Sequence, residues 1–123
     1  MPKNIYNDTK FEIIQRSRDW QQAMDLGHYV VGHTFLDISH PTDDSIVAET
    51  SANWQYREAD IRWYMDKVIT LSDSQLNRTI VHELTHVHLS PLERYIKSSG
   101  SDHLELVVEG LTRAFMEIRN GKI

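Results

Sequence analysis

Residues 82–86 read His-Glu-Leu-Thr-His, an H-E-x-x-H pattern whose residue types and spacing suit metal-assisted hydrolysis. On a helix, residues four apart lie one turn apart and are offset by only about 40° around the axis. The imidazoles of His82 and His86 can therefore reach one metal ion. Glu83 is directed differently and can act as general base toward a water that the metal activates. The pattern predicts His82 and His86 as metal ligands and Glu83 as the catalytic residue.

The apolar residues around this pattern predict that it lies on a helix. They follow at spacings of four, four and three and form one helical face: Leu76, Ile80, Leu84 and Val87. The two histidines lie roughly 200° to 240° from Ile80, nearly opposite that face. A pair of metal-binding histidines at these positions would therefore not interrupt the apolar core. The alternative is an ordinary solvated helix face that carries His and Glu without a metal.

A catalytic zinc site needs three protein ligands and a water, so a later segment must supply one more ligand. The last helical pattern offers two candidates, Glu105 and Glu109. Gly110 would cost about 1 kcal/mol relative to alanine in mid-helix, a cost that close approach of two helices around a shared metal would explain. We therefore favour Glu109 as the third ligand and keep Glu105 as the alternative. Glu109 could also be a surface glutamate that pairs with Arg113.

The elements that must position these residues begin with an amphipathic helix over residues 9–26, with Gly27 as its C-cap. Runs rich in β-branched and aromatic residues, or with alternating apolar residues, then predict three strands. We expect them over residues 28–36, 45–56 and 59–71, the last with a break near Asp66.

Capping boxes predict where the last two helices begin. Ser72 with Gln75 starts the helix of the H-E-x-x-H pattern, and Asp102 with Glu105 starts the final one. We expect Pro91 to end the first of these helices and residues 120–121, Asn-Gly, to end the second. The order predicts an α+β fold with a small, three-stranded, mainly antiparallel sheet.

Length and composition set the wider limits. The chain has 123 residues, 14.4 kDa, which predicts one domain over residues 1–123. It has no cysteine, which excludes disulfides and thiol nucleophiles. A net charge of −5 argues against nucleic acid as a partner. No apolar run approaches membrane-spanning length, and the first residues lack the apolar core of a signal peptide. We therefore expect no membrane partner and a cytoplasmic location.

Residues 82–86 together with residues 109–113, Glu-Gly-Leu-Thr-Arg, resemble the gluzincin zinc metallopeptidases. The short length and the order of elements resemble their smallest members, the minigluzincins, which include many uncharacterised phage and bacterial proteins. The resemblance implies Zn²⁺ held by His82, His86 and Glu109, with Glu83 as base and a peptide or protein as substrate. In thermolysin-like members an acidic residue four positions after the glutamate ligand orients a histidine. Arg113 occupies that position here, so either this orienting contact is altered or Glu105 or another group supplies it.

Two further parts of a peptidase site remain open. Besides Glu105, the candidates for donating a hydrogen bond to the oxyanion or for orienting a metal ligand are polar side chains that the sequence does not place: His88, His103, Tyr95 and Tyr64. A peptide would add as a strand to an exposed sheet edge, which we expect near residues 45–56. The alternative function is a catalytically inactive or self-blocked metal-binding regulatory protein of the same fold. A DNA-associated protease of the SprT type is disfavoured because the chain is short, acidic and free of cysteine.

Overall fold

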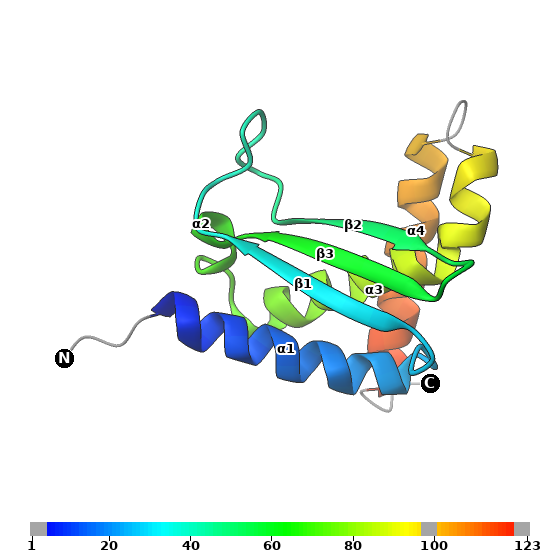
Figure 1. Cartoon of the computed structure of the whole chain (residues 1–123), viewed down its shortest axis with the longest axis horizontal. Coiled ribbons are helices and arrows are strands. Elements are labelled where there is room, and N and C mark those ends of the chain that lie inside the picture. The colour runs from blue at the N-terminus through cyan, green and yellow to red at the C-terminus, as the bar shows by residue number, and fades with distance from the viewer. Residues whose placement is uncertain (1–4, 97–100, 120–123) are drawn as a thin grey trace.

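A three-stranded sheet lies over a layer of helices in the computed structural model (Figure 1), which describes residues 5–96 and 101–119 and all side chains among them except those of 94–96 and 101–103. The elements in chain order are α1 (Ile5–Ala23), β1 (Val30–Leu36), β2 (Ala48–Asn53), β3 (Glu58–Tyr64), α2 (Met65–Val68), α3 (Asp73–Ile96) and α4 (Ser101–Arg119). The predicted α+β class and the predicted order of elements are confirmed. None of the helices within the described ranges has the length and apolar character that a membrane span requires.

The sheet is mixed, where the sequence predicted mainly antiparallel pairing. Its strand order is β1-β3-β2. The hairpin between β2 and β3 makes that pair antiparallel, whereas β1 pairs with β3 in parallel. The reason is the connection over residues 37–47, which carries the chain from one edge of the sheet to the other and leaves the centre for β3. Because β2 is therefore an edge strand, the expected sheet edge within residues 45–56 is confirmed.

The core forms where one face of the sheet packs on the helices. Along β3, alternate residues are buried and point toward the helices: Ala59, Ile61 and Trp63. The predicted apolar face of α3 is buried against them, with Ile80, Leu84 and Val87 all at 0% exposure. Because this apolar face of α3 is buried in the core, the opposite face of the helix, which carries the histidines, points toward the edge strand β2 and toward α4.

The capping box at the start of α3 is confirmed. The backbone N–H of Ser72 donates to Gln75 Oε1 at 2.9 Å, and the backbone N–H of Gln75 donates to Ser72 Oγ at 3.2 Å. The third strand is shorter than predicted, because the chain turns into α2 after Tyr64 and buries Met65 and Val68 at helical spacing. The predicted break near Asp66 is this short helix.

The prediction that Pro91 ends the helix is wrong, since α3 continues to Ile96. Proline has no N–H to offer the carbonyl four residues earlier, which here belongs to Val87. The hydroxyl of Ser90 donates to that carbonyl at 2.9 Å instead. The lost backbone bond is thereby replaced, and the helix passes through the proline.

The first helix also ends differently from the prediction. Its C-terminal turn places Asp25, not Gly27, in the left-handed region with φ of 57°. The backbone N–H of Leu26 donates to the carbonyl of Gln21 at 2.8 Å, and the backbone N–H of Asp25 donates to the carbonyl of Gln22 at 3.1 Å. These two bonds form a Schellman motif. The expected end of α4 at residues 120–121 lies outside the described residues.

Candidate metal centre

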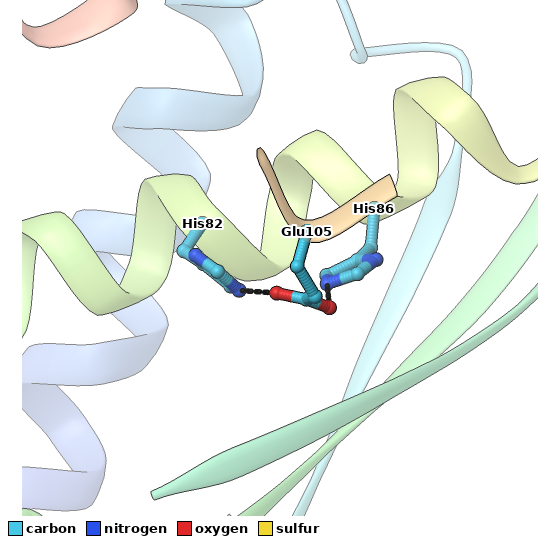
Figure 2. A group of neighbouring side chains, drawn as sticks. All are labelled: His82, His86 and Glu105. Carbon is cyan, nitrogen blue, oxygen red and sulfur yellow. Dashed lines mark ion pairs between the residues drawn. The ribbon is translucent and has the colours of Figure 1, made fainter. Parts of the chain in front are cut away.

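The two histidines of the H-E-x-x-H pattern meet one carboxylate of α4. His82 and His86 lie one turn apart on α3, and Figure 2 shows the Glu105 side chain reaching between their rings. Nε2 of His82 is 3.5 Å from Glu105 Oε2, and Nε2 of His86 is 3.4 Å from Glu105 Oε1. Among the described side chains, these three form a group whose ligand atoms all lie within 4.8 Å of one another.

These separations fit a zinc ion. Zinc bonds to His nitrogen and carboxylate oxygen are about 2.0–2.1 Å long, so tetrahedral ligands lie about 3.4 Å apart. The two observed Nε2–oxygen distances, 3.5 and 3.4 Å, are close to that spacing, and each runs to a different oxygen of Glu105. The histidine side chains are only 21% and 17% exposed, whereas Glu105 is 57% exposed and borders solvent. Two neutral imidazoles and one carboxylate make up a donor set that zinc accepts.

The other nitrogen of each ring is held by a second carboxylate. Glu109 Oε1 lies 2.6 Å from Nδ1 of His82, and Glu93 Oε1 lies 2.8 Å from Nδ1 of His86. A carboxylate at Nδ1 keeps the proton on that nitrogen and leaves the Nε2 lone pair for a metal. Each ring thus has a carboxylate at Nδ1 and presents Nε2 to Glu105, the arrangement in which a metal could bind at Nε2.

The structure does not bring Glu109, the favoured third ligand, to the Nε2 atoms. Its second oxygen accepts a hydrogen bond from Arg78 at 2.8 Å. This bond, aided by His82, lowers the pKa of the Glu109 carboxyl and keeps it charged. Glu109 lies four residues after Glu105 in α4 and contacts Nδ1 of His82, whereas Glu105 lies beside Nε2 of the same ring.

The close-approach argument for Gly110 is wrong. A Cβ at that position would meet no atom within 4 Å, because the glycine faces solvent. Instead, α4 packs on the rest of the fold through Val108 and Thr112, both at 0% exposure. Glu105 precedes Val108 by three residues, so it lies one turn earlier on nearly the same face.

Glu83 is buried in the same cleft, with 5% exposure. The hydroxyl of Thr50 on β2 donates to Glu83 Oε1 at 2.6 Å. Burial raises the pKa of the Glu83 carboxyl, while the Thr50 hydrogen bond and the nearby histidines oppose the rise. A carboxylate whose pKa is raised is a stronger proton acceptor than one with the ordinary pKa.

The cleft has a volume of about 700 Å³ and runs between β2, α3 and the start of α4. One wall is formed by the helix-facing residues of β2, Ala48, Thr50 and Ala52. The opposite side carries the candidate ligands and Leu104. The cleft is large enough for a short stretch of peptide, and small alanine side chains keep the strand side open.

His88 and Tyr64, the two predicted oxyanion candidates whose side chains the structure describes, do not line this cleft. His88 Nε2 lies 2.6 Å from the carbonyl oxygen of Met24, and its ring stacks on Phe115. The Tyr64 hydroxyl donates to Glu49 Oε1 at 2.6 Å, and this bond raises the pKa of Tyr64. Both side chains thus have structural partners. The side chains of Tyr95 and His103 lie outside the described residues.

Three residues of the site were missed from the sequence: Thr50, Arg78 and Glu93. Glu93 follows His86 by seven residues, two helical turns, and so lies on nearly the same face. This signal was lost because the helix was expected to end at Pro91. Thr50 and Arg78 had no local signal, because their contacts are with distant segments of the chain.

Comparison with known proteins adds no relative: no family model, no curated protein and no solved structure matches the chain.

Proposed function

We propose that the protein is a zinc-dependent peptidase. The observation that carries the proposal is the convergence of His82, His86 and Glu105 in the same cleft as the buried Glu83. The ligands are then His82, His86 and Glu105, with Glu109 orienting His82 from outside. Three protein ligands leave a fourth position open, as in catalytic zinc sites.

The chemistry divides between the ion and Glu83. Bound zinc supplies a Lewis acid that polarises the scissile carbonyl and lowers the pKa of a water. Glu83 takes a proton from the attacking water while the oxygen of that water bonds to the carbonyl carbon. The C–N bond then breaks, and Glu83 passes the proton to the leaving amine. The buried position of Glu83 suits it to hold this proton between the two steps.

The substrate is a peptide or a segment of a protein. Because β2 is an edge strand, one side of its backbone has no strand partner within the described sheet. An extended peptide can pair along that edge by adding a strand. It would then run past Thr50, whose hydroxyl contacts Glu83, so strand pairing would bring the scissile bond toward the base.

The second candidate is a metal-binding regulatory protein of the same fold that does not turn over substrate. One observation favours it: Glu83 Oε1 is already engaged by Thr50, and the side chain is 5% exposed. In that state the base would be blocked by the protein's own strand.

Glu83→Gln separates these functions. Zinc-loaded wild-type protein should cleave members of a mixed peptide library, read by mass spectrometry, and a zinc chelator should stop the cleavage. The Glu83→Gln protein should still bind one zinc per chain but lose about 10²–10⁴-fold in rate, the usual contribution of a general base. Equal turnover by the variant would remove Glu83 as base. Zinc binding by wild type without any cleavage would favour the regulatory protein.

A further inference from the structure

Glu93 lies on α3 beyond Pro91 and contacts the ring nitrogen of His86 that faces away from Glu105. The Glu93 Oε1–His86 Nδ1 distance is 2.8 Å, and the side chains are 32% and 17% exposed. We infer that Glu93 is a positioning residue that sets the ring orientation and tautomer of His86 for metal binding. This inference rests on the proposed metal site, but it concerns a residue outside the ligand set and outside the H-E-x-x-H pattern.

The contact depends on the path of α3. In a straight helix, residues seven apart are separated by about 10.5 Å along the axis. Pro91 lies between the two residues, and proline bends a helix. Figure 1 shows the yellow end of α3 turning away from the line of its green part and rising beside α4. The side chain of Glu93 leans toward the helix N-terminus, as helical side chains do, and so toward His86.

Ser90 makes this path stable. Its hydroxyl donates to the Val87 carbonyl at 2.9 Å, which is the group that Pro91 leaves without its usual backbone donor. The helix therefore continues for another turn after the proline instead of ending. Without that turn Glu93 would not reach His86.

The two histidines are then held in the same way from two different places. Glu109 of α4 holds Nδ1 of His82, and Glu93 of α3 itself holds Nδ1 of His86. Outer carboxylates of this kind typically contribute 10–100-fold to metal affinity. The second half of α3 thus forms part of the metal site although it contributes no ligand.

The test measures metal affinity, not turnover. Metal-free full-length protein is titrated with Zn²⁺ against a chromophoric chelator, and with Co²⁺ while its visible absorption is recorded. Glu93→Ala should weaken Zn²⁺ binding about 10–100-fold and change the Co²⁺ spectrum. Glu93→Gln should fall between, because its amide oxygen still accepts a hydrogen bond from Nδ1. The control is Glu117→Ala, an exposed glutamate of α4, which should bind like wild type.

Pro91→Ala tests the same contact without touching the carboxylate. Alanine restores the N–H that bonds the Val87 carbonyl, so α3 should straighten, carry Glu93 away from His86 and weaken Zn²⁺ binding without loss of thermal stability. This variant also decides the matter if Glu93→Ala fails to fold. Wild-type Zn²⁺ affinity in Glu93→Ala would overturn the role of Glu93 and leave the metal site intact. If Glu93→Ala does not fold, wild-type affinity in Pro91→Ala would overturn it. Absence of zinc binding in wild type would instead overturn the proposed function.

Discussion

The hydroxyl of Thr50 on the edge strand β2 donates to Glu83 Oε1 on α3 at 2.6 Å. This bond joins the strand along which a peptide would pair to the carboxylate that would act as base. It also opposes the effect of burial on the pKa of Glu83. In the proposed peptidase, the Thr50 side chain would therefore connect substrate binding to catalysis.

Thr50→Val removes this hydrogen bond with little change of shape. The pKa of Glu83 should rise further, because a hydrogen bond to the charged form is lost. The acid limb of the kcat–pH profile should therefore move to higher pH, and turnover on that limb should fall relative to wild type. The measurement is the pH profile of peptide cleavage by zinc-loaded protein.

Ser51→Ala is the matched control for this variant, since Ser51 is the next residue of β2 and points away from α3. It should keep the wild-type profile. If Thr50→Val instead raises turnover at every pH, Thr50 blocks the base and the regulatory function gains support.

Glu105→Ala and Glu109→Ala should differ in zinc content. Loss of Glu105 removes a proposed ligand, so the purified variant should carry almost no zinc. Loss of Glu109 removes only the carboxylate at Nδ1 of His82, so affinity should fall about 10–100-fold while zinc still binds at saturating concentrations. Elemental analysis after dialysis, followed by zinc titration, measures both. The reverse order of effects would restore Glu109 as the third ligand.

The contrast between these two glutamates shows what a sequence can predict. The spacing of His82 and His86, the capping box of Ser72 and the apolar face of α3 all depend on neighbours within a turn or two. The sequence therefore predicted that both histidines lie on one side of a helix, and the capping box and the apolar face of that helix are confirmed. The choice between Glu105 and Glu109 depends on how α4 is rotated against α3, which is set by Val108 and Thr112 packing on distant residues.

Two other features of the fold, the passage of α3 through Pro91 and the pairing of β1, also could not be predicted from local sequence patterns. A proline ends most helices, but here the neighbouring Ser90 replaces the missing hydrogen bond. The parallel pairing of β1 with β3 follows from a connection that crosses the sheet, and no local pattern records that crossing. Both features result from contacts that secondary-structure patterns do not describe.

Ser72→Ala should lower stability without weakening metal binding. The variant loses the bond to the backbone N–H of Gln75, and loss of an N-cap typically costs about 0.5–2 kcal/mol. Calorimetry of metal-free protein should show a lower Tm. Zinc affinity should stay at the wild-type value, because His82 lies more than two turns further along α3. Ser74→Ala, a change at an exposed residue of the same turn, should leave both quantities unchanged.

His33 should make stability depend on pH. The indole N–H of the buried Trp63 donates to Nδ1 of His33 at 3.0 Å, so the ring must be neutral with its proton on Nε2. Burial lowers the pKa of His33, and the charge of Asp60 opposes this only in part. The unfolded chain, in which the pKa of histidine is about 6.5, therefore binds the proton more readily. The free energy of unfolding should fall as the pH drops below about 6.5 and level off below the folded-state pKa.

The measurement is the Tm of metal-free protein between pH 8 and pH 5, for wild type and for His33→Gln. At pH 8 wild type should be the more stable, because it keeps the bond from Trp63. As the pH falls, the advantage over His33→Gln should shrink, since the variant has no proton to bind at this position. His28→Gln serves as control because His28 is exposed, and its Tm should follow wild type throughout. A difference between wild type and His33→Gln that stays constant from pH 8 to pH 5 would show that His33 does not titrate as its buried, Trp63-bonded position requires.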